Sequence, residues 1–153
     1  MYERILLPTD GSDASLAATA HAGSLARTAG ATVHVVSVAD SRNRFESPSS
    51  GLAPEAWREA ESERAAAAIE KTIEGLPTDV ETDRTVVTGI PQDEIINLVE
   101  KTAADVVVMG THGRSGIDRY LIGSVTERVV RRSPVPVLTV QGDAVRGDSA
   151  TSD

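Results

Sequence analysis

The chain has 153 residues and no cysteine, so its length suits one domain with its own hydrophobic core, and thiolate chemistry and disulfides are excluded. Its formal net charge of −8 at pH 7 argues against broad binding to a nucleic-acid backbone, which depends on lysine and arginine side chains. No apolar run approaches the ~20 residues of a membrane helix and the first residues lack a signal-peptide pattern, so we expect a cytoplasmic protein that binds no membrane.

Strand and helix signals alternate from the start of the chain. Residues 3–10 form a short apolar run of the length typical of a buried strand. A helix follows, which Ser12 or Asp13 can cap and which Gly30 can end. Residues 31–40 are β-branched and almost continuously apolar, a pattern that indicates a parallel strand covered on both faces.

The same alternation continues through the middle of the chain. Residues 40–53 have the composition of a loop, and Pro54 suits the first position of a long helix. Residues 80–89 predict a more polar strand near an edge of the sheet. Pro91 opens another helix, and residues 105–110 predict a fourth strand.

The last elements are a helix from about Ser124 and a strand within residues 133–141. Pro134 and Pro136 interrupt this strand, and each proline removes a ladder donor, so we expect it at an edge. Residues 142–153 read as a disordered tail. Alternating strands and helices predict an α/β fold, one open parallel sheet with right-handed crossovers and helices on both faces.

Four glycines follow the fourth strand closely, and ligands of such sheets bind beyond the carboxyl ends of the strands. Gly110 and Gly113 can turn backbone N–H groups inward as an anion nest, while Gly123 and Ser124 begin a helix whose positive end faces the same space. Ser124 and Thr126 can add hydroxyl donors, and Ser124 can equally cap the helix. Because the P-loop and Gly-x-Gly-x-x-Gly motifs are absent, the segment predicts a different kind of phosphate-binding loop.

The segment GTHGRSGIDRYLIGS, residues 110–124, has the spacing Gly-x2-Gly-x9-Gly-Ser. It resembles the ATP-binding universal stress proteins, and the resemblance extends from ILLPTDGS through HVVSVAD to SPVPVLTV, or about residues 1–141. This resemblance implies a single Rossmann-like domain over residues 1–141 with five strands in the order 3-2-1-4-5. It also implies ATP as the ligand, and Mg²⁺ would enter with the phosphates rather than in a protein cage.

The resemblance further implies roles for individual residues. Pro8, Thr9 and Asp10 would line the nucleoside, with Asp10 reaching the ribose hydroxyls; a helix cap is the alternative role for Asp10. Val38 would offer backbone hydrogen bonds to adenine, and Met109 would close over the base or sugar. The residues implied around the phosphates are Gly110, Gly113, Arg114, Gly123, Ser124, Val125 and Thr126.

The three histidines do not form a catalytic or metal-binding group in the sequence. His21 falls on the first helix and His34 in the second strand, where a packed, hydrogen-bonded side chain is the simpler interpretation. His112 lies inside the glycine segment and is interpreted as a loop side chain. We therefore predict no catalytic residue and no metal held by the protein alone.

The resemblance implies a nucleotide-dependent regulator of the stress response, with slow or no ATP hydrolysis and a protein partner that the sequence does not identify. One alternative is an enzyme related to the ATP pyrophosphatases, which TDGSDAS resembles loosely, although Asp10 stands where their loop needs a glycine amide. Another is a ligand-free structural or chaperone-like dimer, against which the complete glycine set argues. A homodimer is also implied, with the last strands pairing antiparallel through Val135, Val137, Leu138 and Val140.

Overall fold

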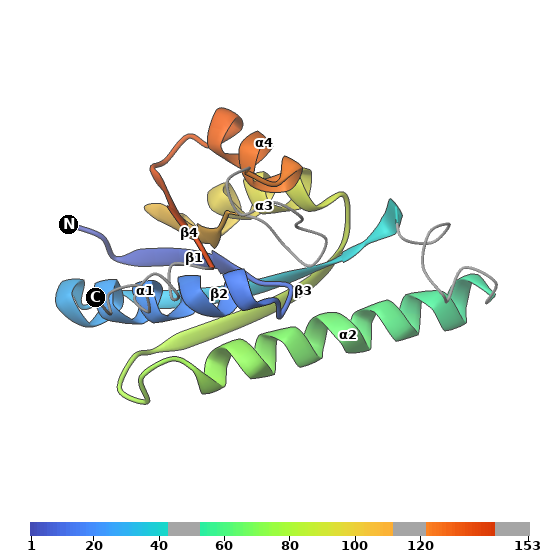
Figure 1. Ribbon diagram of the computed structural model, residues 1–153, viewed down its shortest axis with the longest axis horizontal. Helices are drawn as coiled ribbons and strands as arrows, with labels where there is room; N and C mark the ends of the chain where they lie inside the picture. Colours follow the sequence, from blue (N-terminus) through green and yellow to red (C-terminus); the bar gives the residue numbers. More distant parts are fainter. Residues whose placement is uncertain (43–52, 112–121, 143–153) are drawn as a thin grey trace, which may run out of the picture.

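The computed structural model describes residues 1–42, 53–111 and 122–142 (Figure 1). Within these residues the strands are β1 (Arg4–Pro8), β2 (Thr32–Asp40), β3 (Thr82–Gly89), β4 (Val106–Gly110) and β5 (Val137–Val140). The helices are α1 (Asp13–Ala29), α2 (Pro54–Glu74), α3 (Pro91–Lys101) and α4 (Ser124–Arg132). The strands form one parallel sheet of order β3-β2-β1-β4-β5, which confirms the predicted fold class and strand order. The proposed tail from residue 143 onward lies outside the described residues.

Local capping signals explain where the first three helices begin or end. Ser12 is the N-cap of α1 and accepts a hydrogen bond from the Ser15 N–H, and Gly30 closes the helix in the left-handed conformation at φ 70°. Pro54 and Pro91 occupy the first positions of α2 and α3, where the missing proline N–H costs no helix hydrogen bond. Gly30, Pro54 and Pro91 were predicted at these positions, and Ser12 was one of the two caps proposed for the first helix.

The last strand is shorter than predicted. β5 begins at Val137, so Pro134 and Pro136 precede the strand instead of interrupting it. Pro136 still contributes to the sheet, because its carbonyl accepts a hydrogen bond from the Val107 N–H at 2.9 Å. β5 lies at one edge of the sheet and β3 at the other, as expected for both.

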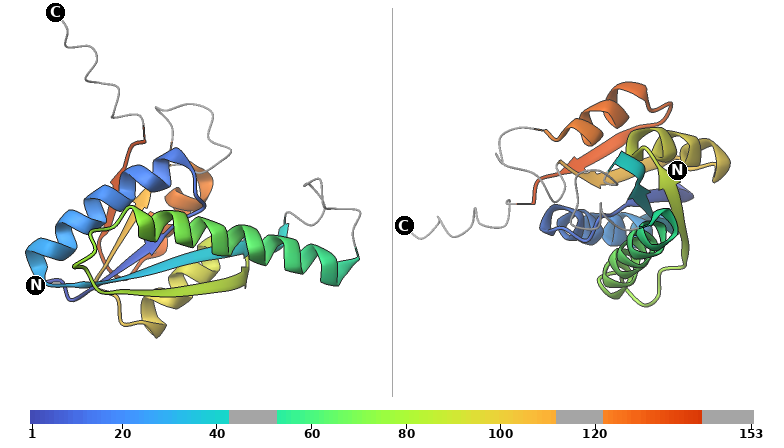
Figure 2. Two further views of the ribbon diagram at one scale, coloured as in Figure 1. Left: turned by 90° about the horizontal axis from the view of Figure 1, so that it is seen from below. Right: turned by 90° about the vertical axis from the view of Figure 1, so that its right-hand side faces the viewer.

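Two hydrophobic cores lie on opposite faces of the sheet. Figures 1 and 2 show α1 and α2 on one face and α3 and α4 on the other. Because successive strand residues point to opposite faces, Ile5 and Leu7 pack with α1 and α2, whereas Leu6 packs with α3 and α4. Each of these three side chains is fully buried, which stabilises the fold by about 1.5–3 kcal/mol per side chain.

None of the helices in the described ranges combines the length and apolar character needed to span a bilayer.

Candidate functional site

The carboxyl ends of β1 and β4 lie side by side in the sheet. The two strands pair in parallel, with Ile5 opposite Val106 and Leu6 opposite Val107. The helices that follow them leave on opposite faces, because α1 packs on one core and α4 on the other. This is the topological switch point at which open α/β sheets bind ligands. It brings Pro8, Thr9 and Asp10 to the same carboxyl end of the strands as Gly110 and the start of α4.

Side chains hold the loop between β1 and α1 in place. The Oδ1 atom of Asp10 accepts hydrogen bonds from the Ser12 N–H and the Ser15 hydroxyl, both at 2.9 Å. The Asp10 N–H donates in return to Ser15 Oγ at 3.2 Å, and Gly11 turns the chain at φ 79°. The cap of α1 is Ser12, so the alternative role of Asp10 as a helix cap is wrong. Asp10 instead fixes the conformation of its own loop.

Thr9 connects this loop to α2 and β2 through buried hydroxyl groups. Thr72 on α2 donates its hydroxyl hydrogen to Thr9 Oγ1 at 2.7 Å, and the Gly11 N–H donates to the same oxygen at 3.1 Å. The Ser37 hydroxyl donates to the Thr9 carbonyl oxygen at 2.8 Å. The exposed fractions of Thr9, Ser37 and Thr72 are 6%, 3% and 0%. We call these three residues the hydroxyl cluster; neither Ser37 nor Thr72 was predicted to belong to the site.

Gly110 permits the close approach of α1 to β4. A Cβ atom at this position would lie 2.8 Å from the backbone carbon and oxygen of Ala14, too close for any side chain. Gly110 is the last residue of β4, and close packing against Ala14 explains the glycine, whereas its place in an anion nest stays a prediction. The Thr126 hydroxyl donates to the Gly110 carbonyl at 2.8 Å, and its side chain is buried. The hydroxyl hydrogen of Thr126 is therefore already used in a hydrogen bond within the protein.

The first turn of α4 presents backbone donors at this edge. Gly123 is the N-cap, since its carbonyl accepts the Glu127 N–H at 2.9 Å, and its own N–H donates to the Thr111 carbonyl at 2.7 Å. Ser124 is the first helical residue and makes no capping hydrogen bond, so its predicted capping role is wrong. The N–H groups of Ser124, Val125 and Thr126 precede the first N–H that donates within the helix, that of Glu127, and such helix-start groups can bind an anion.

Val38 and Met109, two further residues predicted to contact the nucleoside, lie in different surroundings. Val38 lies half-buried near the carboxyl end of β2, where its backbone pairs with β3 at Val87. Met109 is 5% exposed and packs in the core with α3 and α4, so its described position does not match a side chain that closes over a base or sugar. Gly113, Arg114 and His112 lie outside the described residues, and their roles stay predictions.

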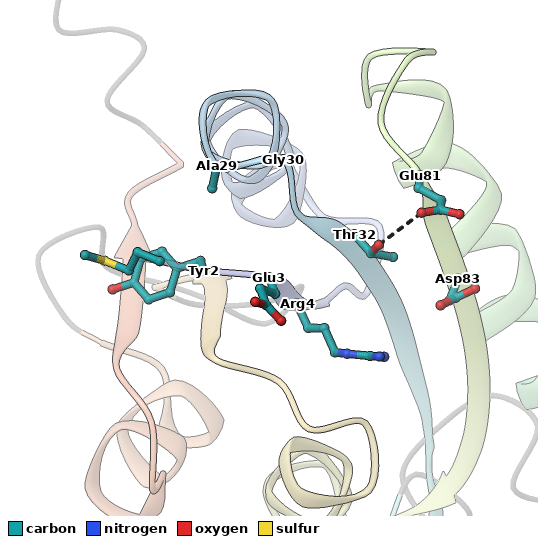
Figure 3. Close-up of a pocket in the computed structure, with 9 residues that line it drawn as sticks. Tyr2, Glu3, Arg4, Ala29, Gly30, Thr32, Glu81 and Asp83 are labelled. Carbon is teal, nitrogen blue, oxygen red and sulfur yellow. Dashed lines mark hydrogen bonds between the residues drawn. The ribbon is translucent and has the colours of Figure 1, made fainter.

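A polar pocket of about 640 Å³ lies at the other end of the strands, where they begin (Figure 3). Its lining comes from the chain start, the end of α1 and the starts of β2 and β3: Met1, Tyr2, Glu3, Arg4, Ala29, Gly30, Thr32, Glu81 and Asp83. Beside it, hydrogen bonds from the Glu3 and Arg4 N–H groups lower the pKa of Asp105 below its ordinary value. Among the described residues, no three acidic or histidine side chains are placed to hold a metal ion. The pocket is remote from the switch point, and we assign it no role.

Comparisons with known proteins agree with this architecture. The family model described as the universal stress protein family matches residues 1–141. A universal stress protein of Methanocaldococcus jannaschii is 38% identical over 144 residues, which cover 92% of this chain and 83% of that protein.

Two solved structures extend the comparison. The structure of protein MJ0577 has a TM-score of 0.70 at 30% identity and covers 92% of this chain and 96% of its own. A universal stress protein in complex with cAMP has a TM-score of 0.60 at 31% identity and covers 92% of this chain and 98% of its own. The chain therefore belongs to the universal stress protein family.

Proposed function

We propose that this chain binds ATP at the carboxyl ends of β1 and β4 and acts as a nucleotide-dependent regulator in the stress response. The observation that carries the proposal is the meeting of two elements at one edge of the sheet: the loop fixed by Asp10 and the first turn of α4. A nucleotide needs both a site for its sugar and base and a site for its phosphates. The two elements supply these separately, and the relative in complex with cAMP supports an adenine nucleotide as the ligand.

The phosphates would lie at the start of α4. Its first backbone N–H groups and the positive end of the helix dipole favour an anion there, and Gly123 leaves the approach free of a side chain. Gly110, Gly113, Arg114, Ser124, Val125 and Thr126 complete the proposed phosphate set. Thr126 would contribute through its backbone, because its hydroxyl already donates to Gly110. Mg²⁺ would be held by phosphate oxygens and water, as is usual for this ion.

The nucleoside would lie against the loop after β1. Pro8 and Thr9 line it, Asp10 accepts hydrogen bonds from the ribose hydroxyls, and the backbone of Val38 meets the adenine. A carboxylate at position 10 would repel a pyrophosphate placed at this loop, which disfavours an enzyme of the ATP pyrophosphatase type.

Hydrolysis should be slow, because the hydroxyls near the two strand ends already serve the fold. Ser15 donates to Asp10, Thr126 donates to Gly110 and Thr72 donates to Thr9. Of these three groups only the Ser15 hydroxyl lies beside a carboxylate, and that carboxylate oxygen, Asp10 Oδ1, also accepts a hydrogen bond from the Ser12 N–H, which makes it a weak base. Turnover should therefore lie far below the roughly 1–100 s⁻¹ of kinases, so that occupancy by ATP, and not its cleavage, carries the signal.

We also propose that β5 pairs with its copy to form a homodimer. β5 is an edge strand, and its Leu138 is 42% exposed. Val140 packs in the core with α1, so Leu138 is the more suitable contact among the predicted interface residues. Light scattering should give twice the chain mass at micromolar concentration, and a strict monomer would contradict the pairing.

The experiment that tests the proposed function is native mass spectrometry of the purified protein, followed by calorimetric titration with ATP after removal of any bound nucleotide. We expect ATP or ADP at about one molecule per chain, and recovery of the same stoichiometry on titration. A protein that co-purifies with no nucleotide and binds none at millimolar ATP would overturn the proposal.

A further inference from the structure

The hydroxyl cluster joins α2 to the loop that we assign to the nucleoside, although α2 carries none of the predicted binding residues. Thr72 is fully buried, and its hydroxyl lies 2.7 Å from Thr9 Oγ1 across 63 residues of sequence. α2 contacts the same loop at a second point, where Lys71 Nζ donates to the Gly11 carbonyl at 3.3 Å. The position of the loop therefore depends on α2.

The hydrogen bonds determine what the Thr9 hydroxyl can do. A hydroxyl group has one hydrogen to donate and two lone pairs that accept. Thr9 Oγ1 accepts from both the Thr72 hydroxyl and the Gly11 N–H, so both acceptor positions are filled. With Thr72 as the donor, no hydrogen bond donated by the Thr9 hydroxyl is found among the described residues, and the two bonds at Oγ1 limit the directions open to its hydrogen. The Thr9 hydroxyl is thus prepared to donate to an acceptor outside the protein.

We propose that Thr72 is a positioning residue of the nucleotide site, an inference that rests on the proposed function. By donating to Thr9, Thr72 orients the Thr9 hydroxyl as a donor to an acceptor on the nucleoside, either a ribose oxygen or a ring nitrogen of the base. It also keeps Thr9 Oγ1 in place as the acceptor for Gly11, whose left-handed turn presents Asp10. Thr72 does this without touching the ligand.

The phosphates should not respond to Thr72, because the described donors proposed for them at the start of α4 are backbone N–H groups. Thr126 and Gly123 hold that helix start through bonds to the Gly110 and Thr111 carbonyls, and neither bond involves α2. A ligand with a nucleoside and a ligand made only of phosphates should therefore separate positioning by Thr72 from a general loss of structure.

The test is calorimetric titration of the wild type, Thr72→Val, Thr72→Ser and Thr19→Val with AMP and with inorganic triphosphate. Valine keeps the shape of threonine and removes the hydroxyl, so we expect AMP affinity to fall on the order of tenfold in Thr72→Val, with triphosphate affinity within about twofold. Thr72→Ser keeps the hydroxyl donor and should bind AMP within about threefold of wild type. Thr19→Val is the matched control, because Thr19 is equally buried but donates to the Ser15 carbonyl within its own helix.

The outcomes separate the two proposals. A wild type that binds neither ligand overturns the proposed function and the role of Thr72 with it. A wild type that binds AMP, together with a folded Thr72→Val of unchanged affinity, overturns the role of Thr72 alone; so does an equal loss of AMP and triphosphate, or a failure of serine to rescue. If Thr72→Val does not fold, Thr72→Ala replaces it with the same expectations.

Hydrogen exchange gives a readout that does not depend on ligand affinity. The Gly11 N–H donates to Thr9 Oγ1, whose position Thr72 fixes, so its exchange should be several-fold faster in Thr72→Val than in wild type. The N–H of Gly123 donates to a backbone carbonyl at the other half of the site and should exchange at the same rate in both proteins. Equal exchange of Gly11 in the two proteins would contradict the positioning role.

Discussion

The two halves of the candidate site are built in different ways. The loop after β1 is held by side chains, since Asp10, Ser12, Ser15 and Thr9 bond to one another or to the loop backbone. The start of α4 is held by two bonds to backbone carbonyls, from the Gly123 N–H and the Thr126 hydroxyl, and what it presents is backbone N–H groups. Side chains can distinguish one nucleoside from another, whereas backbone donors bind phosphate regardless of what is attached to it. The difference predicts that specificity belongs to the first half and most of the affinity for a triphosphate to the second.

The largest expected effect comes from a side chain placed at the start of α4. In Gly123→Val the new side chain lies beside the first-turn N–H groups, and ATP affinity should fall by about a hundredfold or more because the phosphates lose those donors. The residue has φ −63° and ψ 156°, which valine adopts readily, so the melting temperature should change little.

Circular dichroism and ATP titration measure both properties of Gly123→Val. Gly75→Val is the control, since Gly75 ends α2 and a Cβ there would meet Thr19 Cγ2 at an ordinary 3.4 Å. Wild-type affinity in a folded Gly123→Val would place the phosphates elsewhere.

The next effect is on stability, at the point where the two halves touch. Gly110→Ala forces a Cβ to within 2.8 Å of the Ala14 backbone, which should reduce the free energy of unfolding by about 1–3 kcal/mol. Urea unfolding measures the loss, and Gly75→Ala, with no contact shorter than 3.4 Å, should stay within about 0.5 kcal/mol of wild type. Equal stability of the two variants would mean that α1 moves away from β4 at little cost.

Gly110 and Gly123 also show which features of the site a sequence can predict and which it cannot. The starts of α1, α2 and α3 follow from neighbouring residues, and Ser12, Pro54 and Pro91 lie where propensity places them. The spacing of Gly110 and Gly123 predicts a site at the end of β4. That Gly110 is needed for contact with Ala14 depends on how α1 packs on the sheet, which no local pattern encodes.

The wrong cap at Ser124 and the unpredicted role of Thr72 also arise from contacts that a local sequence pattern does not contain. Ser124 is a good capping residue, but the carbonyl of Gly123 already accepts the first helical N–H, so the helix begins one residue too early for Ser124 to cap it. Thr72 has no signal in the sequence, because its partner Thr9 is 63 residues away. Each half therefore holds a feature that local sequence did not predict: the cap of α4 in one, and the partner of Thr9 in the other.

A smaller effect should distinguish charge from structure in the first half. Asp10→Ala removes both the acceptor for the loop and the proposed ribose contact, so adenosine affinity should fall on the order of tenfold while triphosphate affinity is retained or rises. Asp10→Asn is the matched variant, because its side-chain oxygen can still accept from the Ser12 N–H. Competition titrations with adenosine and inorganic triphosphate measure both ligands. Equal loss of the two in Asp10→Ala would remove the ribose assignment.

The smallest expected effect is on the pH dependence of stability, and it comes from His34, which belongs to neither half of the site. His34 on β2 is bonded through Nε2 to Thr85 Oγ1 at 2.7 Å, a distance that fits the packed histidine predicted there. Burial lowers the pKa of His34 below its ordinary value of 6.5; Asp83 opposes this shift and Arg4 adds to it. The unfolded chain therefore binds this proton more readily than the folded chain, so stability is intact above about pH 6.5 and falls as the pH drops toward the lower folded value.

His34→Gln should remove this part of the pH dependence. Urea unfolding at pH 7.5 and pH 5.5 measures it as a smaller difference between the two conditions in the variant than in wild type. His21→Gln, on the exposed side of α1, is made in parallel as the control for replacing a histidine with glutamine. Because His34 bonds across β2 and β3 and touches neither strand end, nucleotide affinity at pH 7.5 should be the same in all three proteins. A loss of AMP affinity in His34→Gln at that pH would show that the nucleoside half reaches further along β2 than Val38, and it would weaken the division of the site into two independently built halves.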